Sequence, residues 1–221
     1  MKYIIHLIFL MSVATDFAQK KPAYQLFTKS GKKITYGKMV KQLEKQQLLF
    51  FGEYHDNPIS HWLSLVLIKD LQKKQKVQIG LEMFEKDNQE ELNQYLGGKI
   101  DAKELDTTAR LWSNYNTDYK PIVDYAKDQE IPVIATNVPR RYAAIVNHYD
   151  WKGLDTLTKP AYDYIASLPI PFDSNLTCYK NILTMMQGHG SSNMVKAQAL
   201  KDATMAQSIL EHLNGNTLFV H

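Results

Sequence analysis

Residues 48–62, LLFFGEYHDNPISHW, combine a β-prone run with the start of a helix. The run 48–51 is short, apolar and β-prone, and the polar sequence GEYH at 52–55 closes it. Asn57 followed by Pro58 is typical of a helix N-terminus, with Asn57 as the cap and Pro58 in the first turn. A buried strand, a polar strand end and a capped helix in direct succession indicate one βα unit of a parallel sheet.

Three further runs of the same kind follow in the chain, and segments with helical periodicity separate them. These runs are residues 77–81, 131–135 and 217–220. The helix that begins at Pro58 is expected to carry Trp62, Val66 and Leu71 toward the core. The alternation predicts an α/β fold with a mostly parallel central sheet flanked by helices.

A hairpin is expected before this sheet, and two helices before its last strand. Residues 24–36 form two short β runs around Gly31, which suits the positive φ of a tight turn, so they predict an N-terminal β-hairpin. Helices are expected over 179–187 and from 192 to about 213. The longer helix has a predicted apolar stripe and a second face suited to lining a pocket. The stripe is Val195, Ala199, Ala206, Leu210 and Leu213, and the second face is Gln198, Asp202 and Met205.

Composition excludes several classes of protein. The 221 residues are 44% apolar and 22% charged, which is ordinary for one globular domain. The formal net charge of +3 is too small to predict a nucleic-acid partner. Cys178 is the single cysteine, so internal disulfides and cysteine-rich metal sites are excluded, and any metal must be held by His, Glu, Asp or Tyr.

The first 18 residues have the pattern of a secretory signal peptide. Lys2 precedes the apolar run 4–11, and small residues lead to cleavage after Ala14 or Ala18. The alternative is a buried N-terminal strand. No cysteine lies near either cleavage position, so a lipid anchor is not expected. The sequence thus predicts an exported protein, periplasmic or membrane-associated, with one domain over residues 19–221.

Chemically active side chains close the predicted strands. Glu53 and His55 follow the first, Glu82 the second, Asn137 the third and His221 the fourth. Ligands of parallel sheets bind at these carboxyl ends, so we expect Glu53, His55 and Glu82 to converge.

His61 can join that group from the first turn of the helix that begins at Pro58. Glu53, His55, His61 and Glu82 are therefore candidate metal ligands, while Glu53, His55 and Glu82 are candidate acid or base catalysts. The structural alternatives are a hydrogen-bonded His55 and a helix-capping Glu53.

A second candidate lies where the third strand leads into a helix. Arg140 and Arg141 follow Asn137-Val138-Pro139, so backbone N–H groups and guanidinium donors together favour an anion such as a carboxylate or propionate. The alternative is a pair of solvent-exposed arginines in a first helical turn.

Four blocks of sequence resemble the ChaN-like haem-binding uptake family, which belongs to a larger group with the Tiki metalloproteases and erythromycin esterases. The blocks are GEYHDNPISH (52–61), LEMF (81–84), NTDYKPIVDYAKDQEIPVIATNVPRR (116–141) and KAQALKDATMAQSI (196–209). The resemblance extends from about Tyr24 to the last residue. It implies a sandwich-like α/β fold, haem bound through a tyrosine, and a role in iron acquisition.

The resemblance also implies the site and its partners. It places the haem ligand upstream of the last helix, where we choose Tyr179, with Tyr162, Tyr164 and His189 as alternatives. The other candidate cofactor-binding residues are Asn137, Arg140, Gln198, Asp202 and Met205. Haem is the expected cofactor, and an outer-membrane haem receptor and a homodimer are the expected protein partners. The rival function is a metal-dependent hydrolase that uses a divalent metal at Glu53, His55 and Glu82.

Two features depart from the family pattern. Many relatives are lipoproteins, whereas this chain lacks the required cysteine. Relatives also continue past the strand at Thr217 with a histidine-bearing segment, so we expect a truncated chain that lacks its last strand and helix. The alternative is a protein that has lost a terminal strand and part of its site.

Overall fold

The computed structural model describes residues 22–185 and 191–221. The chain separates into two compact units, residues 1–34 and residues 35–221, and each is described by itself. The predicted signal peptide at 1–18 and His189 lie outside the described residues.

The described part of the first unit contains the predicted hairpin. Strand β1 (Leu26–Phe27) pairs antiparallel with β2 (Lys33–Ile34). Gly31 has a φ of 77°, and its N–H donates to the carbonyl of Thr28 at 2.9 Å. A residue with a side chain is strained at this φ, so the glycine is what permits the tight turn.

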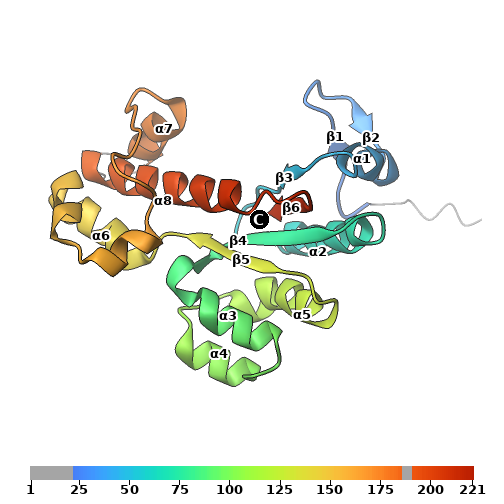
Figure 1. The fold of residues 1–221 in the computed structure, drawn as a ribbon. Helices are drawn as coiled ribbons and strands as arrows, with labels where there is room; N and C mark the ends of the chain where they lie inside the picture. The colour runs from blue at the N-terminus through green and yellow to red at the C-terminus, as the bar shows by residue number, and fades with distance from the viewer. Residues whose placement is uncertain (1–21, 186–190) are drawn as a thin grey trace, which may run out of the picture. The chain divides into compact units, whose positions relative to one another are not determined.

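The second unit is built on a parallel sheet with the strand order β3-β6-β4-β5 (Figure 1). Its strands are β3 (Leu48–Phe50), β4 (Val77–Glu85), β5 (Val133–Asn137) and β6 (Thr217–Val220). The α/β fold with a parallel central sheet is therefore confirmed. Strand β4 is longer than predicted, so Glu82 lies within it rather than after it. Strand β5 starts two residues later than expected.

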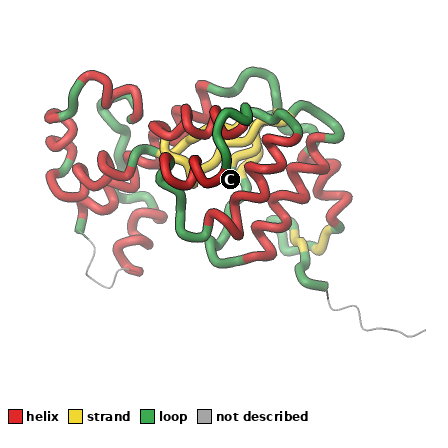
Figure 2. The backbone as a smooth tube through the Cα atoms, turned by 90° about the horizontal axis from the view of Figure 1, so that it is seen from below, coloured by secondary structure: helices red, strands yellow, loops and turns green. Residues whose placement is uncertain are grey.

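Helices connect and cover these strands, as Figure 2 shows in a second view. The α-helices are α1 (Tyr36–Leu43), α2 (Pro58–Gln72), α3 (Gln89–Leu96), α4 (Ala102–Thr108), α5 (Lys120–Asp128), α6 (Arg140–Tyr149), α7 (Thr177–Met185) and α8 (Ser192–Glu211). Shorter turns are the 3₁₀ helices η1 (Lys86–Asn88), η3 (Trp151–Thr156) and η4 (Lys159–Tyr164) and the π-helix η2 (Tyr115–Tyr119). Among the described residues, no helix is both long and apolar enough to span a membrane.

The two faces of the sheet are buried by different helices. Val133 and Ala135 of β5 belong to the main core with residues of α2, α3 and α5. Ile134, between them, packs with Leu218 and with Ile209 of α8. Successive side chains of a strand point to opposite faces, so this division follows from the alternation along β5. Because helices cover both faces, apolar side chains of β5 are buried on both sides of the sheet.

Helix α2 begins where the sequence predicts, but it turns a different face to the core. Its buried residues are His61, Ser64, Leu67, Ile68 and Leu71. Leu71 is buried as predicted, whereas Trp62 is 49% exposed, so its assignment to the core is wrong. The burial of His61 sets this rotation, because residues three and four apart share one helix face.

Asn57 caps this helix as the sequence predicts. Its Oδ1 accepts hydrogen bonds from the backbone N–H of Ile59 at 3.0 Å and of Ser60 at 3.2 Å. Asn57→Ala removes both, so we expect it to lower the free energy of unfolding by about 1 kcal/mol. Chemical denaturation measures this loss, and Asn57→Asp, which retains the acceptor, should restore most of it. An alanine variant as stable as the natural chain would contradict the capping role.

Helix α8 does not have the single apolar stripe that the sequence predicts. Val195 and Ala199 are buried, but Leu210 is 68% exposed and Leu213, beyond the helix, is 39% exposed. Ala197 and Leu200 instead pack with Tyr142, Ala143 and Val146 of α6, a group that we call the α6 cluster, and Ile209 packs on the sheet. The helix contacts several elements along its length, so the buried face changes direction from one end to the other.

Candidate functional site

The carboxyl ends of the strands meet around a buried carboxylate, Glu53, whose side chain is 4% exposed. Its Oε1 accepts a hydrogen bond from the Tyr119 hydroxyl at 2.7 Å, and its Oε2 lies 2.7 Å from Nε2 of His221. Nδ1 of His55 lies 3.2 Å from Oε1. The predicted approach of His55 to Glu53 is thus present, and His221 reaches the same carboxylate from β6.

His61 completes this group from the first turn of α2. Its side chain is 5% exposed, with Nε2 3.0 Å from Oε2 of Glu53 and Nδ1 3.3 Å from Oδ1 of Asp118. The imidazole lies between two carboxylates, although neither ring nitrogen has the geometry of a hydrogen bond. We call Glu53, His55, His61, Tyr119 and His221 the Glu53 cluster.

Glu82 lies beside the Glu53 cluster and is connected to it by backbone hydrogen bonds. Its N–H donates to the carbonyl of His221 at 2.9 Å, and its own carbonyl accepts from Nδ2 of Asn137 at 3.1 Å. Within the described residues, its half-buried carboxyl has no hydrogen bond or ion pair. Glu82 is therefore a neighbour of the cluster and is close enough to interact electrostatically with His55 and Lys201.

A second polar group joins α7 to α8 around Tyr179. The Tyr179 hydroxyl donates to Oδ2 of Asp202 at 3.0 Å, and Nε2 of Gln198 donates to Oδ1 of the same carboxylate at 2.8 Å. Tyr179 is 7% exposed and packs with Val195 and Ala199. Burial, with the negative charge of Asp202, raises the pKa of the Tyr179 phenol. Tyr179, Gln198 and Asp202 are thus brought together.

The other candidates near α7 and α8 have different surroundings. Met205 is half-buried further along α8. Tyr162 is 38% exposed and donates to the carbonyl of Leu154 at 3.0 Å, while Tyr164 is partly buried against the α6 cluster. Of the three predicted tyrosines, Tyr179 is the one that combines burial with a carboxylate partner.

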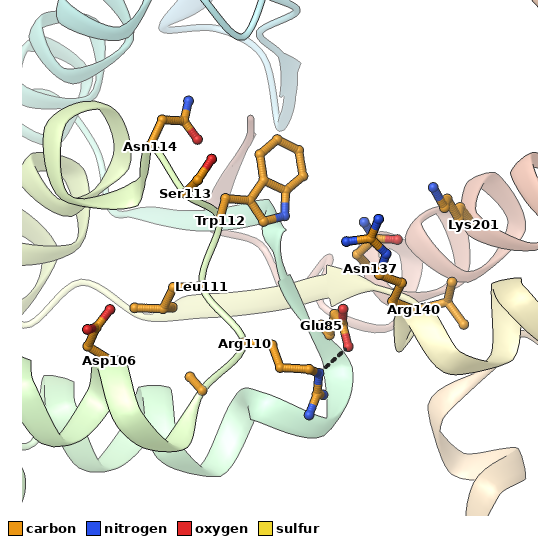
Figure 3. Close-up of a pocket in the computed structure, with 12 residues that line it drawn as sticks. Glu85, Asp106, Arg110, Leu111, Trp112, Ser113, Asn114, Asn137, Arg140 and Lys201 are labelled. Atoms are coloured by element: carbon orange, nitrogen blue, oxygen red, sulfur yellow. Dashed lines mark hydrogen bonds and ion pairs between the residues drawn. The ribbon is translucent and has the colours of Figure 1, made fainter.

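Arg140 and Arg141 have different environments despite being adjacent. Arg141 Nη1 and Arg110 Nη2 both donate to the carboxylate of Asp87, so the prediction of a shared anion site at both arginines is wrong for Arg141. Arg140 instead lines a cavity of about 740 Å³ at the ends of β4 and β5, together with Asn137 and Lys201 (Figure 3).

A family model described as "Haem-binding uptake, Tiki superfamily, ChaN" matches residues 39–221. The chain belongs to this ChaN family. The solved structure described as "Cofacial heme binding to ChaN of Campylobacter jejuni" has the same fold, with a TM-score of 0.66 and 19% sequence identity. That match covers 89% of this chain and 78% of the other.

A curated plant protein is also similar to the chain. Protein RETICULATA-RELATED 5, chloroplastic, from Arabidopsis thaliana is 26% identical over 185 residues, a match that covers 77% of this chain. The chain spans 25% of the length of that protein. The matched region is thus a minor part of the plant protein.

Sequence reasoning missed Tyr119, a member of the Glu53 cluster, and Asp118, which lies beside His61. Tyr119 is fully buried, in a segment where several tyrosines surround a helix start. The π-helix η2 places it over His61, with ring centroids 5.2 Å apart. The signal available in the sequence was its inclusion in the family block at 116–141.

The Glu53 cluster does not support the predicted divalent-metal site. Among the described residues, no group of three or more His, Cys, Asp or Glu side chains is arranged to hold a metal ion. Both Glu53 oxygens are already engaged, by Tyr119 and by His221, and the donor atoms point at one another. The prediction of Glu53, His55, His61 and Glu82 as joint ligands of a divalent metal therefore lacks structural support among the described residues.

Opposing effects set the charges in the Glu53 cluster. Burial by itself would raise the pKa of Glu53, but the Tyr119 hydrogen bond and the positive charge of His221 together bring it below its ordinary value of 4.5. Burial lowers the pKa of His221 below 6.5, and Glu53 only partly opposes this effect. Burial raises the pKa of Glu82. The cluster therefore stabilises an ionised Glu53.

Acid is expected to destabilise the fold through His221. Because its pKa is lower in the folded than in the unfolded chain, the unfolded chain binds more protons, and stability falls as the pH drops below 6.5. His221→Gln removes this titration. Denaturation at about pH 8 and about pH 5 should show a smaller loss of unfolding free energy in the variant than in the natural chain. An equal loss in both would contradict the prediction.

Proposed function

We propose that this chain binds haem and serves in haem or iron handling. Its membership of the ChaN family supports this function. The observation that carries the proposal is the buried hydrogen bond from the Tyr179 hydroxyl to Asp202, in which a phenol and a carboxylate meet between α7 and α8. Haem proteins use tyrosine as an axial ligand, as catalase does.

The residues around Tyr179 fit the chemistry of haem. Bound ferric haem supplies an iron that favours a hard, anionic oxygen ligand. Tyr179 would hold it, and Oδ2 of Asp202, at 3.0 Å, is positioned to accept the phenolic proton. Gln198 fixes the orientation of that carboxylate by donating to its other oxygen.

The surroundings of Tyr179 also suit a large apolar ring. Phe172 lies with its ring centroid 5.8 Å from that of Tyr179, and Trp151 packs against Phe172 at 5.9 Å. Ile182 and Leu183 are partly buried against the same cluster. Burial of apolar surface is the main favourable contribution to binding such a ring.

Titration with hemin tests the proposed function directly. We expect a Soret band that grows to saturation and a high-spin ferric spectrum typical of a tyrosine-ligated iron. The same titration of an unrelated protein of similar charge controls for non-specific adsorption. A spectrum that remains the sum of free hemin and protein would reject the proposal.

We further propose that the protein acts outside the cytoplasm, on the basis of the signal-peptide pattern at 1–18. An outer-membrane haem receptor and a second copy of the chain are the partners proposed for it. Fractionation of expressing bacteria tests the export, and light scattering with and without hemin tests the homodimer. Protein confined to the cytoplasm, or a monomer in both conditions, would contradict the corresponding part.

A further inference from the structure

The cavity at the ends of β4 and β5 has two chemically different walls (Figure 3). Leu111 and Trp112 lie on the segment that follows α4, and they provide apolar surface. Arg140 at the start of α6 and Lys201 of α8 lie on the other side. An occupant with one apolar part and one anionic part matches this arrangement.

Arg140 and Lys201 place two cations on the wall of the cavity. Within the described residues, neither forms an ion pair, whereas nearby Arg110 and Arg141 are both bound to Asp87. Glu85 also lines the cavity, but its carboxylate accepts from Nε of Arg110 at 2.9 Å. The cationic wall is therefore available to an anion.

Two further features of the backbone and side chains favour a polar occupant. Helix α6 begins after Pro139 and has no side-chain cap, so N–H groups of its first turn are open to an anion. Asn137 is 8% exposed and lines the cavity, and its Oδ1 has no hydrogen-bond partner within the described protein. A buried acceptor without a donor is unfavourable, so this wall is suited to a polar ligand rather than to apolar packing.

Helix α8 contributes residues both to this cavity and to the proposed haem site. Lys201 lines it, and the next residue of α8, Asp202, accepts the hydrogen bond from Tyr179. Glu82 interacts electrostatically with both Lys201 and Asp202, which places the three side chains in one neighbourhood. A single ligand with an iron and peripheral carboxylates has the chemistry to use both places.

We propose that this cavity is a carboxylate-binding site, in which Arg140 and Lys201 hold the propionate groups of the haem. The inference rests on the proposed haem function and extends it, since it assigns the anionic edge of the ligand to named residues. Guanidinium and ammonium groups bind carboxylates through charge-assisted hydrogen bonds. Trp112 and Leu111 then flank the apolar ring edge.

The test compares hemin with hemin dimethyl ester, which has the same ring and iron but no propionate charges. In the natural chain we expect hemin to bind at least about tenfold more tightly than the ester. Arg140→Gln and Lys201→Gln should each reduce this preference, and the double variant should abolish it. Lys41→Gln on α1, an exposed residue outside the cavity wall, is the matched control for lost charge and should retain the preference.

The outcomes separate failure of this inference from failure of the proposed function. Equal affinity for hemin and its ester, or a preference that survives in the double variant, would overturn the propionate site and leave haem binding intact. Binding of neither porphyrin would overturn both.

Nuclear magnetic resonance with succinate, in the absence of haem, tests the carboxylate chemistry separately from the porphyrin. Saturable shifts that the double variant loses would support a site for a free carboxylate. The absence of such shifts, together with equal porphyrin affinities, would overturn the carboxylate site entirely.

Discussion

Hemin is expected to bind Tyr179→Phe about 100-fold more weakly than the natural chain, a change equivalent to ~2.7 kcal/mol. The substitution keeps the ring that packs with Val195 and Ala199 and removes only the oxygen that would meet the iron. The high-spin ferric bands should also disappear, because phenylalanine offers no ligand. Absorption titration measures both effects.

Tyr162→Phe is the matched control for this experiment. It removes a phenolic oxygen that donates to the carbonyl of Leu154, so it should leave hemin affinity and spectrum unchanged. The melting temperature of each apoprotein shows whether the fold survives. An unchanged spectrum and affinity in Tyr179→Phe would eliminate Tyr179 and direct attention to Tyr162, Tyr164 or His189.

Glu53→Ala is expected to lower the free energy of unfolding by about 3–5 kcal/mol, because removing one member of a buried ionic group leaves the others unpaired. Glu53 is the acceptor for Tyr119, and its Oε2 lies 3.0 Å from Nε2 of His61 and 2.7 Å from Nε2 of His221. The alanine variant also leaves a cavity at the ends of the strands. Chemical denaturation of the apoprotein measures the effect.

Glu90→Ala is a suitable control for Glu53→Ala. Glu90 is exposed on α3, where it accepts a hydrogen bond from Gln94 one turn away, so its loss should change stability by no more than about 0.5 kcal/mol. Similar small losses in both variants would show that the Glu53 cluster contributes little to the fold. The interpretation of Glu53 as a buried ionised centre would then be wrong.

Much of the architecture was accessible from local pattern. The short apolar runs, the Asn57 cap and the turn at Gly31 are features of a few consecutive residues, and each has a strong conformational preference of its own. The convergence of Glu53 and His55 with a neighbouring strand followed from the same logic, since parallel strands end at one edge. These inferences needed no knowledge of distant contacts.

The orientation of helices was less predictable. Trp62 was assigned to the core because it is large and apolar, yet the buried position on that turn is His61. The burial of His61 depends on Glu53, which follows strand β3, and on Asp118, which belongs to η2. Hydrophobicity within α2 carries no information about those distant carboxylates.

From the sequence we could predict which polar residue closes each β run, where α2 begins, and that two helices precede the last strand. Tertiary structure decided which of those residues share an environment. It brought the Tyr119 hydroxyl to Glu53, 66 positions away in the sequence, and the Tyr179 hydroxyl to Asp202. It also placed Arg141 against Asp87, whereas the adjacent Arg140 lines a cavity. The physical reason is that local conformation depends on neighbours in sequence, whereas charge pairing and burial depend on side chains that only the packed fold brings within hydrogen-bond distance.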